Sequence, residues 1–508
     1  MNNVKLIFLI EWKLLVRSKS LPLLVFLMTA SACYAIYYGT SKIKEQKAYI
    51  QYLIETNTST KKSIDDYFTN PIVADTSKVG YNKMYTVHDP AMTEEYLNDN
   101  VAINSPNSFS SFSIGQRDVY PVYRKVSARC LYYDGGGISL DEKYSEITNP
   151  QKLMSGNFDL AFLFIYLFPL LVIALCFNLY SAEKEQGTLA LISTQHVSLR
   201  HILFLKLQFR VLLVAGLVIS YSVFAYFFSP VSSPDDFQKM LSWIGIVLLY
   251  QIFWFSLCYL VVGFKHGSAS NALALFCCWL LILVIVPSAV NSYVESNYSI
   301  NSRMVVLEEL RDRTGDIWDL PNSVTYAAYF ESYPAYKKEV AEKFPADGFD
   351  RMGNNDSLKV FYTQKFFVWH YYLDKVISKS MASYNQQLKA KTEAAGMFSF
   401  INPAITTQET LNDIAASGSL RYQHFRNETK HYRNILFEIS NKYVFEEKKL
   451  SLADYRHYPS FSMAEEDIGK GYAKNSFVLV VLIFVLLVAD YGRQQFYSIR
   501  KQSFKISL

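Results

Sequence analysis

Six long apolar runs constrain the fold of this chain more than any other feature of its sequence. A transmembrane helix needs about 20 mainly apolar residues, and the runs are close to that length. The sixth run, Phe477–Tyr491, is short, and Ser476 or Ala473 extends it. Pro287, near the end of the fifth run, predicts a bend there. The predicted spans are 21–39, 159–180, 201–228, 239–264, 271–290 and 476–492.

Basic residues near the span ends predict the orientation of the chain. Lysine and arginine precede the first span, follow the sixth, and occur in the connections between spans two and three and between spans four and five. Six spans put all four groups on one side, which is the cytoplasmic side by the positive-inside rule. The short connection on the other side holds Asp235 and Asp236 against one Lys239. We therefore expect both termini, including the tail 493–508, in the cytoplasm.

Two long polar regions, 40–158 and 291–475, separate the spans. They are too long to be simple connections, so we expect them to build a large α+β extracytoplasmic domain. The first opens with a helical pattern that continues the first span, then becomes rich in turns and short extended runs. The second is mostly helical: 303–313 is predicted to prolong the fifth span, and 358–391 and 422–450 to form two long helices. The predicted fold class is a mostly α polytopic membrane protein.

The segment 1–20 precedes the first span and is amphipathic. Its apolar residues recur at helical spacing, which predicts a helix lying in the cytoplasmic interface. Such a helix is either a simple anchor or a platform that transmits movement. The residues that make the pattern are Leu6, Ile7, Ile10, Leu14 and Leu15.

The connection 181–200 is charged although apolar spans flank it. Glu183, Lys184 and Glu185 would each cost about 2.5–3.5 kcal/mol at the centre of a bilayer, so they are predicted to reach the cytoplasm. Gly187 is predicted to end the short helix, and Ser198 to cap the next one. The connection is then a rigid protruding element. It is either a solvated loop or a docking site for a soluble partner.

Several chemistries have no support in the sequence. There is no GxxxxGK[ST] phosphate loop, no HExxH and no GxSxG, so neither ATP hydrolysis nor a known hydrolase site is expected in this chain. The net charge of +5 is too small to indicate a nucleic-acid partner. Cys130 is the only cysteine in the polar regions, which argues against an internal disulfide there, and no Cys/His cluster predicts a metal site.

Some residues are open to two interpretations. Lys206 and Arg210 enter the third span one helical turn apart, and either line a conduit for an acidic substrate or extend to the interface. The aromatic residues of 366–372 either hold an apolar ligand or form a helix–helix core, and His370 among them is expected to be a packed helix residue. No charge lies near the middle of a span, which disfavours a proton-coupled carrier.

Two motifs resemble those of the type-2 exporter (ABC-2 type) ABC transporter permease family. "EWKLLVRS" at 11–18 resembles its interfacial-helix motif, and "EKEQGTLALISTQHVSLRHILFLK" at 183–206 resembles its coupling motif. The two occur in the family's order around the same spans. The resemblance implies that the matching residues contact an ATPase partner. These residues are Glu11, Arg17, Glu183, Lys184, Glu185, Gly187 and Thr188.

Further stretches resemble one subfamily of these permeases, which carries large extracytoplasmic insertions of unknown function after spans one and five. They are 149–175, "DIWDLP" at 316–321, "ESYP" at 331–334 and 401–433. One departure is "AASGS" at 415–419, where relatives often have a Gly-Thr-Asp turn.

The resemblance implies a permease subunit without catalytic residues or a cofactor of its own, in a bacterial inner membrane. Its partners would be cytoplasmic ABC ATPase subunits that hold ATP and Mg, a second permease copy or a similar permease, membrane lipid and periplasmic proteins. The expected activity is movement or extraction of an amphiphilic or peptide-like substrate. The alternatives are a mechanotransmitter that drives periplasmic partners without a conduit, a membrane-anchored binding or scaffold protein, and, last, a membrane hydrolase.

Overall fold

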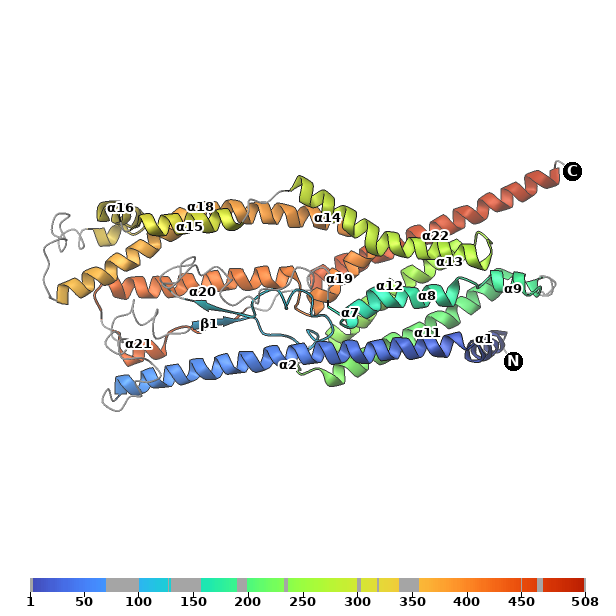
Figure 1. Cartoon of the computed structure of the whole chain (residues 1–508), viewed down its shortest axis with the longest axis horizontal. Helices are drawn as coiled ribbons and strands as arrows, with labels where there is room; N and C mark the ends of the chain where they lie inside the picture. Colours follow the sequence, from blue (N-terminus) through green and yellow to red (C-terminus); the bar gives the residue numbers. More distant parts are fainter. Residues whose placement is uncertain are drawn as a thin grey trace.

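The computed structural model is an elongated, mostly helical molecule with apolar spans at one end and polar helices at the other (Figure 1). Both ends of the chain lie at the apolar end. The structure describes residues 3–69, 100–126, 128, 157–189, 199–232, 236–298, 303–317, 319–337, 356–448, 450–463 and 469–506.

Within these residues, six helical segments are long and apolar enough to cross a membrane, so the chain is a multi-pass membrane protein. The predicted number and order of spans are confirmed. The first four segments are α2 (Ser20–Thr69), a run of α7 (Leu160–Phe162), η1 (Leu163–Leu167), α8 (Phe168–Cys176) and α9 (Ser181–Glu185), then α11 (Leu199–Phe228) and α12 (Asp236–Val262). The last two are a run of α13 (Ser268–Leu280), η2 (Leu281–Ile285) and α14 (Val286–Asn297), then α22 (Gly469–Ile506).

The helices of the first and sixth spans extend well beyond the predicted span ends. α2 has 50 residues, and at 1.5 Å per residue it is about 75 Å long, far more than a bilayer needs. Its polar half buries Ile43, Ile50 and Ile64, and its bounds confirm that the first span continues into the polar region as one helix. α22 likewise continues to Ile506, because no proline interrupts it. The separate helix α1 (Asn3–Arg17) precedes α2.

The polar helices and one small sheet form a second unit, which we call the polar module. Strands β1 (Asn100–Ile103) and β2 (Tyr123–Val126) pair antiparallel, with Asn100 opposite Val126. Four aromatic rings, those of Tyr329, Phe367, Phe437 and Phe445, are buried in its core. The helices of the polar module are α15 (Arg303–Asp316), α16 (Asn322–Ser332), η3 (Pro334–Tyr336), α18 (Asp356–Ser399), α19 (Pro403–Ile414), α20 (Ser419–Phe445) and α21 (Leu452–Arg456).

The aromatic stretch of α18 is a packed core. Phe367 is fully buried against Phe437 of α20, with ring centroids 4.7 Å apart, and Trp369 and His370 are also buried. The helix-core interpretation of these residues is confirmed. The two predicted long helices are confirmed as α18 and α20.

The expectation that 303–313 prolongs the fifth span is wrong. α14 ends at Asn297, and Tyr298 has non-helical angles (φ −121°, ψ 64°). α15 is a separate helix that packs along α18 (Figure 1). The physical reason is the sequence 296–302, "SNYSINS", whose serines and asparagines favour turns over helix interiors.

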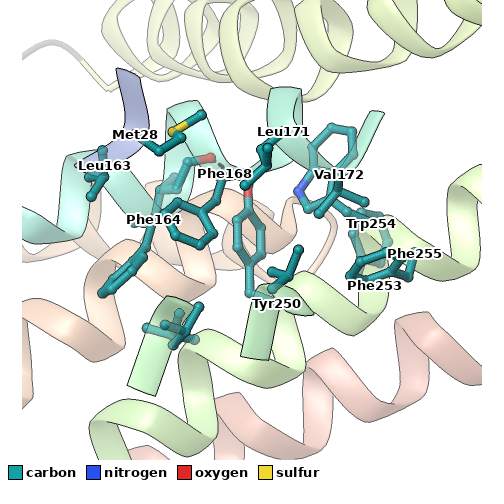
Figure 2. Packing of buried hydrophobic residues seen from close by; sticks show 14 of the residues in the cluster. Met28, Leu163, Phe164, Phe168, Leu171, Val172, Tyr250, Phe253, Trp254 and Phe255 are labelled. Atoms are coloured by element: carbon teal, nitrogen blue, oxygen red, sulfur yellow. Dashed lines mark hydrogen bonds between the residues drawn. The ribbon is translucent and has the colours of Figure 1, made fainter. Parts of the chain in front are cut away.

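The second span is the centre of the apolar bundle. Figure 2 shows Leu163, Phe164, Phe168, Leu171 and Val172 packed together with aromatic residues of α12 and with Met28 of α2. All five side chains are essentially inaccessible to solvent. The charged connection that follows this span is therefore joined to the most buried of the six candidate spans. The α12 residues drawn there are Tyr250, Phe253, Trp254 and Phe255.

The segment 104–122, which we call the junction loop, joins the polar module to the bundle. Its Phe112 packs edge-on against Trp243 of α12, with ring centroids 5.3 Å apart. Its Asn107 side chain donates to the carbonyl of Ile414 at 2.8 Å. Ser111 O lies only 1.9 Å from where a Cβ on Gly39 would be, so this close approach to α2 requires glycine.

Candidate functional site

The charged connection after the second span begins with one short helix. α9 covers Ser181–Glu185, and Gly187 follows in the left-handed region at φ 76°. A Cβ on Gly187 would meet no atom within 4 Å, so glycine is favoured there by backbone conformation and not by lack of space. The predicted end of the helix at Gly187 is confirmed. Ser198 and the motif residues 190–198 lie outside the described residues.

A largely buried ion-pair cluster fixes this helix to its neighbours. The Lys206 ammonium lies 2.6 Å from the Glu183 carboxylate of α9 and 3.0 Å from the Glu11 carboxylate of α1. Arg210 lies 3.1 Å from the other oxygen of Glu11 and also donates to the carbonyl of Leu175. Two carboxylates thus face two cations, so the buried charges are compensated. We call these four side chains the charge cluster.

The charge cluster gives Lys206 and Arg210 a structural role. Arg210 is 7% exposed and Glu11 only 2%. Lys206 and Arg210 tie α11 to α1 and α9 through these ion pairs. The two interpretations from the sequence, a conduit lining and extension to the interface, stay predictions.

Glu185 makes a second attachment, on the other side of α9. One carboxylate oxygen accepts the backbone N–H of Ser268 at 3.0 Å, and the other accepts its hydroxyl at 2.9 Å. The Ser268 hydroxyl also lies 2.7 Å from that of Ser181. Ser268 is the first residue of α13, where the helix dipole favours a negative charge. The connection is therefore bound to the third and the fifth span.

The remaining motif residues divide into two groups. The Thr188 hydroxyl donates to the Glu183 side chain and, at 3.2 Å, to the Glu183 backbone carbonyl. Lys184 and Gly187 are exposed, together with Gln186, and form the tip of the connection. Arg17 is exposed at the last residue of α1.

The structure therefore brings Glu11, Glu183 and Thr188 together, places Glu185 beside them, and leaves the tip uncovered. The sequence reasoning did not assign Ser268 to this site or recognise that Lys206 and Arg210 are the partners of Glu11 and Glu183. Charge balance could have indicated this pairing. Two acidic residues lie in motifs near span ends, and two basic residues lie one helical turn apart on an adjacent span.

An apolar groove of about 580 Å³ lies beside the charge cluster, between α1, α11, α12 and α22. Phe8 of α1 is one of its lining residues and meets Phe209 edge-on, with ring centroids 5.4 Å apart. A groove of this size with few polar groups has the dimensions of a site for an apolar chain. Its lining residues include Phe204, Leu207, Val211, Leu212, Phe255 and Leu487.

The described cysteines, Cys33, Cys176, Cys258, Cys277 and Cys278, are free thiols. Cys130 and the glycines 135–137 lie outside the described residues. In the part of the chain that the structure describes, no three His, Cys, Asp or Glu side chains gather as metal ligands.

Comparison with known proteins assigns no activity to this architecture. No curated protein and no solved structure matches the chain. Residues 304–464, which cover most of the polar module's helices, match the model of a domain of unknown function, DUF3526.

Proposed function

We propose that this chain is the membrane-spanning permease subunit of an ATP-driven ABC transporter of the exporter class. It would couple ATP hydrolysis by separate cytoplasmic ATPase subunits to movement or extraction of an amphiphilic or peptide-like substrate. In this proposal the protein lies in a bacterial inner membrane with both termini in the cytoplasm, and pairs with a second permease copy or a similar permease.

The observation that carries the proposal is the attachment of the charged connection. Glu183 and Glu185 bind Lys206 of α11 and Ser268 of α13, while Lys184, Gln186 and Gly187 are exposed and make up the tip. These two attachments hold α9 on both sides. A force applied at the tip is therefore passed directly to α11 and α13, which is what coupling to an ATPase requires.

A second candidate function is mechanotransmission without a conduit. It is favoured by α2, a single helix that runs from beside α1 into the far part of the polar module (Figure 1). The junction loop also binds the polar module firmly to the bundle, through Asn107, Phe112 and the close approach at Gly39. Movement of the spans would then reach a partner that binds the polar module.

The decisive experiment is copurification of ATPase subunits with tagged full-length variants, together with the hydrolysis rate. Lys184→Glu should release the ATPase, because a desolvated interface charge left unpaired costs about 2–5 kcal/mol. Gly187→Val should weaken binding without changing charge, because a β-branched residue in the left-handed region costs about 1–3 kcal/mol.

The matched control is Lys379→Glu, a charge reversal at an exposed position of α18 in the polar module. It should leave ATPase binding unchanged. Full ATPase retention by both tip variants would contradict the proposed coupling role. Failure of any ATPase to copurify with the unmodified chain would favour a membrane-anchored binding or scaffold protein.

A further inference from the structure

Two spans contain a π turn, and in both a proline follows it. In the second span η1 (Leu163–Leu167) precedes Pro169, and in the fifth span η2 (Leu281–Ile285) precedes Pro287. A π turn widens the helix by one residue and often occurs at functional positions. Proline has no N–H and cannot complete the backbone hydrogen bonds of a helix interior. The sequence predicts a bend at Pro287 but not this shared arrangement.

The hydrogen bonds of each π turn identify a carbonyl that its own helix cannot satisfy. Phe168 N–H bonds to Leu163 O, and Val286 N–H bonds to Leu281 O, five residues back in both cases. In the same register, the next carbonyl of the second span is that of Phe164, and the next carbonyl of the fifth span is that of Ile282. The donors they would require are residues 169 and 287, and both are proline.

Side chains from neighbouring helices supply the missing donors. The Gln251 amide of α12 donates to Phe164 O at 2.9 Å, and the Tyr250 hydroxyl donates to the adjacent Ile165 O at 3.0 Å. The Asn402 amide donates to Ile282 O at 2.7 Å. Gln251 and Asn402 are each 2% exposed, so these bonds are shielded from water. Figure 2 shows Tyr250 beside the second span.

We propose that the two π turns are hinges of the bundle, and that Gln251 and Asn402 are latches that hold them by replacing the donors the prolines lack. The two latches differ in origin. Gln251 belongs to a span, whereas Asn402 lies between α18 and α19 and caps α19 by accepting Ala404 N–H at 2.9 Å. α19 connects α18 to α20 of the polar module and packs against the spans α12 and α22. Displacing α19 therefore removes the donor from Ile282 and loosens the fifth span. This link does not depend on the proposed ATPase partner.

A double-mutant cycle on the purified full-length protein in lipid nanodiscs tests the fifth-span latch. Asn402→Ser keeps a good helix cap but is too short to reach Ile282. It should lower the melting temperature by about 2 °C and increase hydrogen exchange in 281–287. Pro287→Ala restores a backbone N–H, so the Asn402→Ser effect should largely vanish in the Pro287→Ala background.

The second-span latch is an independent repeat of the test, with Gln251→Met and Pro169→Ala. Asn271→Ala is the matched control, because Asn271 donates at 3.2 Å to Phe177 O, where no proline is the missing donor. Neither proline substitution should rescue it. The proposal would be overturned if Asn402→Ser and Gln251→Met lowered the melting temperature equally whether or not the prolines are present. Rescue of Asn271→Ala by either proline substitution would overturn it as well.

Discussion

At the residue scale, two positions have the same left-handed backbone conformation, but one is a glycine, which tolerates it, and the other is an alanine, which it strains. Gly115 and Ala416 both lie in the left-handed region, at φ 52° and 51°. A Cβ on Gly115 would come within 2.7 Å of the Ser417 hydroxyl, so glycine is required there by conformation and by space. Ala416 has the same backbone strain, although it is not a glycine. Its contact with Arg117 uses only the backbone: the Ala416 carbonyl accepts a hydrogen bond from the guanidinium at 3.0 Å.

These two positions make a paired prediction about stability. Gly115→Ala should destabilise the protein by about 1–3 kcal/mol or more, because it adds a clash to the strain. Ala416→Gly should be neutral or stabilise it by up to about 1 kcal/mol, because relief of strain exceeds the added freedom of the unfolded chain. Melting curves of the purified protein measure both. Equal loss of stability in the two variants would show that the strain argument at Ala416 is wrong.

At the element scale, the sequence was sufficient to predict helices whose hydrophobic pattern has a continuous period. It was insufficient where a single residue changes the hydrogen-bond register of a helix. The periodic pattern after Thr40 predicts that the helix of the first span continues into the polar region, and α2 does so. The π turns add one residue to a helix turn, which a hydrophobic run of uniform composition cannot reveal. The break between α14 and α15 was visible only as a short polar run, whose local turn preference outweighed the helical pattern on either side.

The charge cluster leads to a prediction about how firmly α1 is attached. Glu11→Gln should destabilise the protein by about 3–5 kcal/mol, because it leaves the buried guanidinium of Arg210 without a carboxylate. Glu183→Gln should cost about 1 kcal/mol or less, because Lys206 keeps Glu11 and the Glu183 side chain is partly exposed at 17%. Thermal unfolding and protease protection of α1 measure the difference. Adding Arg210→Met to Glu11→Gln should recover most of the loss; a double variant as unstable as the single would exclude an uncompensated charge as the cause.

At the scale of the whole molecule, the six spans and the helical character of the second polar region were predictable, because both rest on composition and period. The docking of the junction loop was not. It depends on pairs such as Asn107 with Ile414, which are more than 300 positions apart and leave no pattern in the sequence. The charge cluster is intermediate: its motif residues were identifiable, but the pairing of Glu11 with Arg210 across 199 positions required the fold.

The orientation of the molecule is the largest-scale prediction that the basic residues make. α9 lies at the end of the bundle opposite the polar module (Figure 1), so labelling of the two ends must give opposite results. In a cysteine-free background, single cysteines at the exposed positions Lys61 and Lys389 should react with a membrane-impermeant maleimide in intact cells, and one at Gln186 should react only after permeabilisation. All three sites should react in detergent, which controls for buried thiols. Reaction at position 186 in intact cells would reverse the orientation, put the exposed tip of the charged connection outside the cytoplasm, and thereby remove the physical basis for an ATPase partner.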